Sequence, residues 1–222
     1  MLNKDLHRIK MYEILQEVFT SEIWKYLAFK WWTACYFFHA LDRFSTDLDF
    51  DLIKDYEDID EEMIKILGKY GTLKQGKYNL KLSYGEDDVN IKVDINRKVW
   101  ENNSYEILNF YGTDILTQDK QTIFANKLVA LTERNTNRDI YDVYFFFKNN
   151  FDINNELIFE RTWKTRKELF QEIITKLEKL GENYKILDWL WEVLSDEKHK
   201  SFVKNKLVSE LIWLLRFKID FE

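Results

Sequence analysis

The 222-residue sequence lacks proline and contains only six glycines and one cysteine, Cys35. Average usage would supply about 11 prolines and about 16 glycines. A single cysteine excludes an intramolecular disulfide framework and fits a reducing compartment, so we expect a cytoplasmic protein. The most apolar stretch, residues 26–41, is interrupted by Lys30 and His39. It is too short to cross a bilayer, and we expect no membrane partner.

Tryptophan, by contrast, occurs eight times and outnumbers glycine. Apolar residues make up 45% of the chain and charged residues 32%, which is a globular composition and excludes disorder. The formal net charge of −6 argues against strong non-specific RNA binding. Basic residues are more frequent after residue 160. They indicate either solvated helix faces or a local surface for a nucleic-acid backbone.

Hydrophobic periodicity divides the chain into a mixed part and a helical part. In the first part we predict helices at 5–26, 33–41 and 59–70, and strands at 26–29, 44–53, 79–84, 89–96 and 105–111, with a turn at 85–88. After about residue 116 we predict helices at 119–133, 138–149, 164–180, 184–194 and 199–217. The sequence therefore predicts an α+β fold, with a small mixed sheet and flanking helices followed by a helical C-terminal region.

The strand at 44–53 carries the most informative pattern. Asp47, Asp49 and Asp51 alternate with apolar residues, which predicts a half-buried strand. Asp47 and Asp49 then project side by side, and their repulsion is relieved if a cation lies between them. Mg²⁺ prefers such oxygen ligands, with Asp94 of the 89–96 strand as a candidate third carboxylate and Asp51 as a bystander. The alternative is a solvated strand face, although aspartate is depleted in strands.

A second polar group lies between residues 127 and 142. Lys127 and Arg134 are two helical turns apart, and Asp139 and Asp142 are spaced i, i+3. One interpretation is a structural helix pair with Asn137 as the N-cap of the second helix. In the other, Lys127 contacts a nucleotide phosphate and Asp142 positions it or acts as a base.

These segments together resemble a known family. Residues 29–34, Phe-Lys-Trp-Trp-Thr-Ala, and residues 43–50, Arg-Phe-Ser-Thr-Asp-Leu-Asp-Phe, resemble the first motif of the AbiEii/AbiGii nucleotidyltransferase toxins. That motif reads K-G-G-[ST]-A, then R-[FY]-S-x-D-[IL]-D-[FL]. Residues 127–142 resemble the family's K-x-x-A-L-x-x-R…R-D-x-x-D segment. The resemblance covers about residues 26–147 and says little of residues 150–222.

The resemblance implies a polymerase-β-like nucleotidyltransferase core at residues 1–116 and a helical domain at 117–222 that completes the active site. It implies Mg²⁺-dependent transfer of a nucleotide from an NTP to an RNA acceptor, which is tRNA in several relatives. The setting would be a toxin–antitoxin or phage-defence pair (abortive infection), with a cognate antitoxin as partner. Transfer of this kind depends mainly on positioning and charge neutralisation.

The resemblance also implies roles for individual residues. The metal ligands would be Asp47, Asp49 and Asp94, and Lys127 and Asp142 would complete the catalytic group. The nucleotide-binding residues would be Trp31, Trp32, Thr33, Arg43, Ser45 and Lys127. Arg43 and Ser45 would in addition orient the carboxylate strand.

The sequence departs from the family at one position pair, where Trp31-Trp32 replaces Gly-Gly. Glycines let backbone N–H groups approach phosphate at a helix N-terminus, whereas two indoles would fill that space. Three explanations compete: an inactive relative that binds RNA or a partner, a displaced loop, or UGA glycine codons translated as tryptophan. UGG codons at both positions would exclude the third. A transferase that modifies protein hydroxyls is a further alternative.

The remaining singular residues favour structural roles. The three histidines show no zinc-site spacing. Cys35, the run at 145–147, and the pair Trp189 and Trp191 are expected in the core.

Overall fold

The computed structural model describes residues 3–76, 79–85, 90–134, 136–181, 184–194 and 196–221. The chain folds into two compact units. The first consists of residues 1–40, 44–99 and 105–118, and the second of residues 41–43, 100–104 and 119–222. No helix among the described residues is long and apolar enough to cross a membrane.

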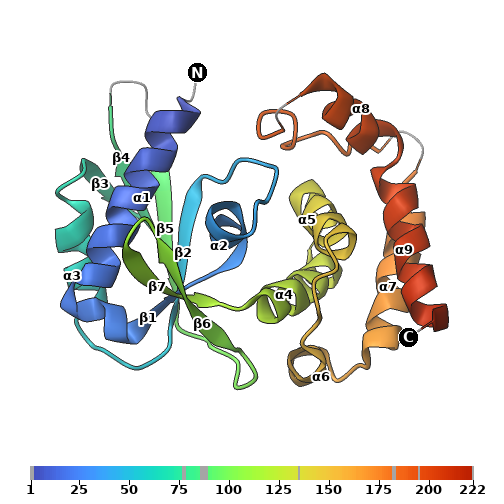
Figure 1. The fold of residues 1–222 in the computed structure, drawn as a ribbon, viewed down its shortest axis with the longest axis horizontal. Coiled ribbons are helices and arrows are strands. Elements are labelled where there is room, and N and C mark those ends of the chain that lie inside the picture. The colour runs from blue at the N-terminus through green and yellow to red at the C-terminus, as the bar shows by residue number, and fades with distance from the viewer. Residues whose placement is uncertain are drawn as a thin grey trace. The chain divides into compact units, whose positions relative to one another are not determined.

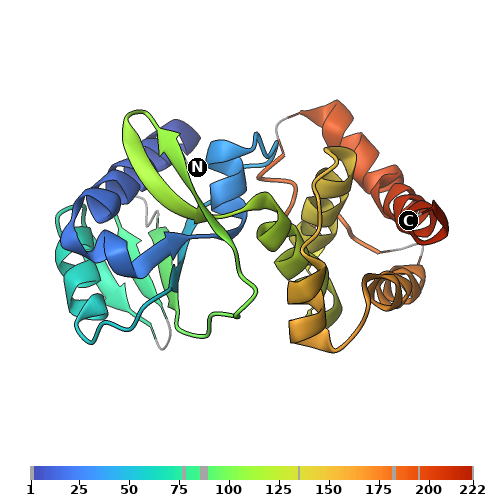
Figure 2. The same cartoon turned by 60° about the horizontal axis from the view of Figure 1, so that its bottom comes forward.

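The first unit is built on a seven-stranded mixed sheet with the order β3-β4-β5-β2-β1-β7-β6 (Figure 1). Its strands are β1 (Leu27–Phe29), β2 (Asp47–Leu52), β3 (Thr72–Gln75), β4 (Leu80–Ser83), β5 (Asn90–Asn96), β6 (Tyr105–Phe110) and β7 (Thr113–Gln118). β2 lies at the centre, parallel to β5 and antiparallel to β1. The antiparallel pair of β6 and β7 ends the sheet at one edge (Figure 2). The predicted mixed sheet is therefore confirmed.

Helices cover both faces of this sheet. They are α1 (Lys4–Thr20), the 3₁₀ helix η1 (Glu22–Tyr26), α2 (Trp31–Phe38) and α3 (Ile59–Leu67). α1 and α3 lie on one face and α2 on the other (Figure 1). The Phe19 ring of α1 contacts the Phe50 ring of β2, with centroids 6.3 Å apart. The predicted helix at 5–26 ends early, because Ser21 adopts an extended conformation after Thr20.

Both faces of β2 are buried, so the prediction of a half-buried strand is wrong. Leu48 and Phe50 are fully buried on the apolar face, and on the acidic face Asp51 is fully buried and Asp49 is 5% exposed. The cause is the central position of β2, together with α2 on its acidic side, where the Thr33 hydroxyl donates to the Asp47 carbonyl oxygen (2.5 Å). The polar face of this strand is therefore an interior surface.

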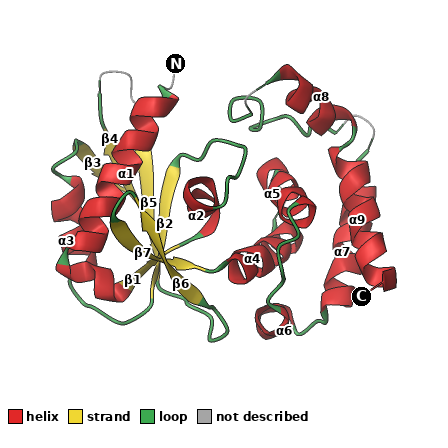
Figure 3. Cartoon of the chain, in the orientation of Figure 1, coloured by secondary structure: helices red, strands yellow, loops and turns green. Residues whose placement is uncertain are grey.

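Every regular element of the second unit is a helix among the described residues (Figure 3). They are α4 (Lys120–Glu133), α5 (Asn137–Lys148), α6 (Asn155–Thr162), α7 (Arg166–Glu178), α8 (Glu197–Asn205) and α9 (Leu207–Phe221). The aromatic run at 145–147 is buried, as predicted. The predicted helix at 199–217 is divided into α8 and α9 at Lys206, whose backbone is not helical.

Two further predictions on this unit are wrong. The segment at 184–194 forms a series of turns rather than a helix, with Trp189 in the left-handed backbone region. Trp189 and Trp191 lie outside the core and are 80% and 51% exposed.

In the first unit, Gly85 has a positive φ, as a turn requires. The rest of the turn predicted at 85–88, and Val89, lie outside the described residues.

One buried carboxylate connects five strands of the sheet or their ends. Asp51 accepts hydrogen bonds from Lys30 (2.8 Å) and Asn96 (3.0 Å) on one oxygen, and from Tyr105 (3.1 Å) and Gln118 (2.7 Å) on the other. Lys30 follows β1, and the other three donors lie on β5, β6 and β7. A buried charge costs little only when it is paired and hydrogen-bonded. Asp51 is therefore a structural residue that holds the sheet together.

We expect Asp51→Asn to lower the free energy of unfolding by about 3 kcal/mol, because it leaves the buried Lys30 ammonium without its counter-charge. Urea unfolding at pH 7 measures the change. The matched control is Asp55→Asn, which alters an exposed aspartate and should change stability by less than about 0.5 kcal/mol. Equal effects of the two substitutions would refute the structural role of Asp51.

Candidate functional site

The acidic residues of β2 and β5 share one face of the sheet. In the parallel register, Asp47 lies opposite Lys92 and Asp49 lies opposite Asp94. Side chains at opposed positions of paired strands project to the same side. The structure thus places the three predicted metal ligands on one surface, with Lys92 among them.

The Asp49 carboxylate is buried without a hydrogen-bond or ion-pair partner among the described residues. It is 5% exposed. Burial is the main cause that raises its pKa to about 7, and the charges of Asp47 and Asp94 raise it further. The positive charges of Lys30 and Lys92 lower this pKa, but by less than the other causes raise it. Asp49 is therefore a carboxylate that burial has left without the counter-charge that Asp51 receives two residues later.

A divalent cation fits this arrangement only in part. Among the described residues, no three His, Cys, Asp or Glu side chains gather in a group that could hold a metal ion. Asp94 instead contacts Lys92, at 3.4 Å. The remaining donor set is Asp47 and Asp49. This set suits Mg²⁺, which is bound through one or two carboxylates together with substrate phosphates.

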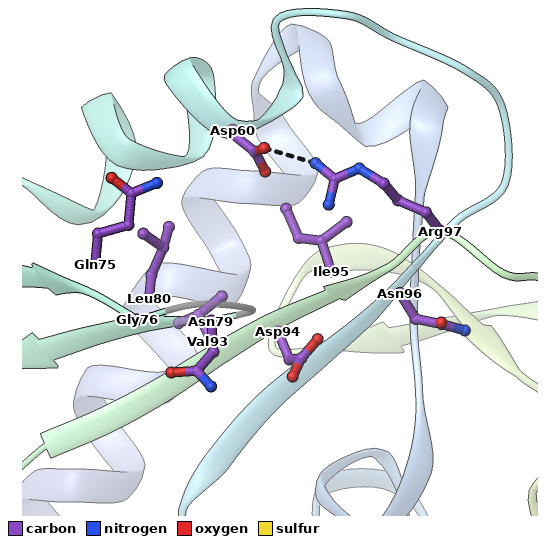
Figure 4. A pocket seen from close by; sticks show the side chains of 10 residues that line it. All are labelled: Asp60, Gln75, Gly76, Asn79, Leu80, Val93, Asp94, Ile95, Asn96 and Arg97. Atoms are coloured by element: carbon purple, nitrogen blue, oxygen red, sulfur yellow. Dashed lines mark hydrogen bonds and ion pairs between the residues drawn. The ribbon is translucent and has the colours of Figure 1, made fainter.

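A pocket of about 390 Å³ lies beside β5 (Figure 4). The described residues that line it include Asp94 but neither Asp47 nor Asp49. An ion pair between Asp60 and Arg97 (2.6 Å) closes one side of it, and in Figure 4 the Asp94 carboxylate points away from this pair. The pocket is therefore distinct from the acidic pair, which carries the functional argument.

Two stacked indoles occupy the N-terminus of α2. The Trp31 and Trp32 rings stack with centroids 4.7 Å apart, and the Lys30 ammonium lies 4.3 Å from the Trp31 ring centroid. Trp31 has a φ of 66°, in the left-handed region that favours glycine. The two tryptophans thus lie where a phosphate loop would require open backbone.

Two buried hydroxyls join α2 to the start of β2. Thr33 donates to the Asp47 carbonyl oxygen, so the 2.7 Å bond between the Thr33 and Ser45 hydroxyls has Ser45 as donor. In addition, the Lys30 N–H donates to the Asp49 carbonyl oxygen at 2.9 Å. These bonds fix the turn before α2 beside the acidic pair. A direct contact of Thr33 or Ser45 with a nucleotide stays a prediction.

The second unit contains a separate group of buried charges. Arg43 makes a bidentate ion pair with Asp142, with distances of 2.6 and 2.7 Å. The Lys127 ammonium contacts Asp142 (2.6 Å) and also Asp139. Arg134 binds Asp139 at 2.7 Å. Three cations thus surround two carboxylates.

These contacts decide the protonation of the two carboxylates. Burial raises the pKa of Asp142, but the charges of Arg43 and Lys127 outweigh it and hold this pKa below its usual range. Lys127 and Arg134 lower the pKa of Asp139 against burial in the same way. The N-cap of α5 is Thr136 and not Asn137, as one of the two interpretations had it, because the Thr136 side chain accepts from the Asp139 N–H.

The structure brings the predicted residues of this group together, but they bind one another and are buried. Lys127 is 1% exposed and Asp142 is fully buried, and the Arg43 guanidinium binds Asp142. Direct contact of Lys127 with a phosphate therefore stays a prediction. Sequence analysis assigned no role to Lys30 or Lys92, although Lys30 opens the first motif and Lys92 shares the polar alternation of Asp94.

A comparison with known protein families identifies the family of the chain. The model of the family described as nucleotidyl transferase AbiEii toxin, type IV toxin–antitoxin system, matches residues 27–210. The chain belongs to the AbiEii nucleotidyltransferase toxin family. The match includes both carboxylates of the acidic pair and the charge group of the second unit. No curated protein matches the chain.

Solved structures similar to this AbiEii family member share its fold. MenT4, a nucleotidyltransferase toxin from Mycobacterium tuberculosis H37Rv, has a TM-score of 0.60 at 17% identity, over 96% of this chain and 84% of that one. JHP933 from Helicobacter pylori has a TM-score of 0.58 at 17% identity, over 98% and 95%. A second Helicobacter pylori protein, described as a nucleotidyltransferase, has a TM-score of 0.62 at 20% identity, over 99% and 96%.

We expect Asp49→Asn to stabilise the metal-free protein by about 2–4 kcal/mol at pH 8. The pKa of Asp49 is raised from 3.8 to about 7 in the folded state, so the cost of its ionisation begins above about pH 4 and is complete above about pH 7. This cost, and with it the gain in the variant, should fade as the pH falls toward 4. Urea unfolding between pH 5 and 8 measures both. A loss of stability at pH 8, as expected for Asp51→Asn, would contradict the assignment.

We expect Lys127→Met to lower the free energy of unfolding by about 3 kcal/mol at pH 7, because Asp139 and Asp142 lose a buried counter-charge. The lowered pKa values of both carboxyls mean that their stabilising effect is present above about pH 4 and is lost as the pH falls further. The difference from the unaltered protein should therefore shrink in acid. The exposed Lys204→Met on α8 is the control, and a pH-independent difference would contradict this explanation.

Proposed function

We propose that this AbiEii family member transfers a nucleotide from an NTP to an RNA acceptor, with Mg²⁺ held by Asp47 and Asp49. In the cell it would act as the toxin of a toxin–antitoxin or phage-defence pair and bind a cognate antitoxin. The family description supports the transferase class and the toxin–antitoxin setting. RNA as acceptor, with tRNA as the first candidate, is an expectation from the family resemblance.

The observation that carries the proposal is the buried carboxylate of Asp49 beside Asp47, which has no hydrogen-bond or ion-pair partner among the described residues. A sheet interior that pairs Asp51 with four donors has the means to neutralise a carboxylate. Among the described residues it gives Asp49 no such partner, at a cost in stability. Buried groups with shifted pKa values are enriched at functional sites, and a cation that arrives with the substrate would remove the cost.

The chain's own contribution is mainly positioning. Asp47 and Asp49 would hold the cation, which neutralises the charge that develops on the phosphate oxygens during transfer. The bonds from Thr33 and Lys30 to the β2 backbone hold the first turn of α2 next to the acidic pair. Backbone N–H groups at a helix N-terminus favour phosphate, so this turn would receive the triphosphate. Asp94 would join the site if its contact with Lys92 opened.

The charge group of the second unit would act as a positioning element. Asp139 and Asp142 are neutralised by Lys127, Arg43 and Arg134, and the half-exposed Arg134 side chain (42%) is the member best placed to meet a phosphate. We propose that this unit completes the active site. Among the lysines on its helices, Lys200 pairs with Glu197, so only a local surface would receive RNA.

One observation favours a second function, an inactive member that binds RNA or a partner. The stacked Trp31 and Trp32 rings occupy the position proposed for the triphosphate. If they exclude NTP, the fold and the acidic pair would remain while transfer is lost.

A transfer assay tests the proposal. Purified protein is incubated with Mg²⁺, each labelled NTP in turn, and total cellular RNA plus protein extract. The chain with Trp31 and Trp32 is compared with the variant Trp31→Gly/Trp32→Gly. We expect label in small RNA, stronger in the glycine variant because its α2 N-terminus is open.

The matched controls are made in the more active of these two forms. Asp49→Asn should reduce transfer about a hundredfold or more, because a metal ligand is lost, while the protein stays folded by circular dichroism. Asp55→Asn should keep full transfer. Full activity of Asp49→Asn would exclude the mechanism. Label in protein would indicate the other acceptor class, and no label from either form would favour the inactive binding protein.

A further inference from the structure

Three tryptophans lie in a backbone conformation that suits glycine. The φ angles are 66° at Trp31, 58° at Trp163 and 65° at Trp189. Among the described residues, six other than glycine have a positive φ, and three of these are tryptophan, although tryptophan supplies only 8 of the 222 residues. For a bulky side chain this region is a genuine outlier. Tryptophan is therefore over-represented among the residues with a left-handed backbone.

The surroundings of Trp163 match the place where helices end in glycine. Trp163 ends α6 in the left-handed conformation, and its N–H donates to the Phe159 carbonyl oxygen at 2.8 Å. Glycine is the usual residue at such a helix end. The Trp163 side chain is 79% exposed, so packing does not explain why an indole is tolerated there.

Trp189 repeats this combination within the turns between α7 and α8. Its side chain is 80% exposed. Strained backbone persists only where the surrounding structure determines it, and a side chain in solvent determines very little. A glycine at either position would adopt the same φ without strain.

The other tryptophans of the chain do not have a left-handed backbone. Trp213 lies within α9, where its ring stacks on Phe217 with centroids 5.6 Å apart. Trp24 lies in η1. Neither has a positive φ. The chain therefore contains two classes of tryptophan, of which only one occupies glycine backbone.

We infer that positions 31, 163 and 189 are glycine in the protein as its own organism makes it, because their codons are UGA and that organism decodes UGA as glycine. Tryptophan stands in the sequence because a different code was applied. The composition agrees, since glycine is scarce and tryptophan abundant. The backbone of Trp32 is not left-handed, so the geometry does not assign that position.

A glycine at position 31 would change the first turn of α2, and the effect of this change rests on the proposed function. Glycine there would remove the ring that stacks on Trp32 and lies beneath Lys30. The first turn of α2 would then be open to a triphosphate. The assignments of positions 163 and 189 are independent of any activity.

The first test compares the gene with the protein from its source organism. We expect UGA at positions 31, 163 and 189, UGG at position 213, and glycine at the three positions in peptide mass spectra. UGG at any of the three positions, or tryptophan in the native peptides, would overturn the inference.

The second test uses the purified chain as written. We expect W163G and W189G each to raise the folding equilibrium constant several-fold, seen as a higher urea midpoint at an unchanged m-value, because left-handed strain is relieved. The matched control W163A removes the indole but keeps the Cβ atom, and it should give no such rise. W213G should lower the constant about fivefold, as glycine does within a helix.

An equal rise in W163A and W163G would overturn the inference, because the gain would then come from loss of an exposed ring. A fall in both W163G and W189G would do the same. Neither the codons nor the urea midpoints depend on nucleotide transfer. Failure of this inference and failure of the proposed function are therefore distinguishable.

Discussion

Burial of the acidic face of β2 imposes the constraint on which the first unit depends. Asp49 and Asp51 are two residues apart on one central strand and both are removed from water. Asp51 receives one cation and three further donors, which come from residues at or beyond β1, β5, β6 and β7. Asp49 has no such partner among the described residues. The same environment thus yields one residue that stabilises the sheet and one whose ionised carboxylate costs stability.

In the second unit, cations neutralise the buried carboxylates. Its two buried carboxylates, Asp139 and Asp142, are bound by Lys127, Arg43 and Arg134. A buried ion group of this kind contributes geometric definition more than net stability. The contrast supports different roles for the two groups. The one in the first unit leaves Asp49 without a counter-charge among the described residues, and the one in the second unit joins α4 to α5.

Much of this arrangement could be predicted from local pattern. The alternation around Asp47 and Asp49 predicts a strand, and helical periodicity predicts most of the helices. The β7 strand was missed because its sequence, Thr-Asp-Ile-Leu-Thr-Gln, is largely polar, and it forms a strand by pairing with β1 and β6. The donors to Asp51 were missed because Tyr105 and Gln118 meet it only through the order of strands in the sheet.

The two motifs predicted the family correctly, but they did not predict the environment of each residue. Asp51 looked like a bystander because spacing alone does not show which carboxylates find partners. Trp189 looked like a core residue because it is hydrophobic, but hydrophobicity contains no information on backbone conformation, and Trp189 lies exposed in a turn with a positive φ. The partners of buried polar residues and the positions of left-handed turns are therefore the features that could be seen only in the structure.

The pKa of Asp49 tests the central claim most directly. It can be measured by carbon-13 NMR of the labelled carboxylate in the full chain, with and without Mg²⁺. The account predicts a value of about 7 without the cation and a clear decrease when Mg²⁺ is added, because a bound cation favours the ionised form. A value near the ordinary 3.8 without Mg²⁺, or a raised value that Mg²⁺ leaves unchanged, would contradict it.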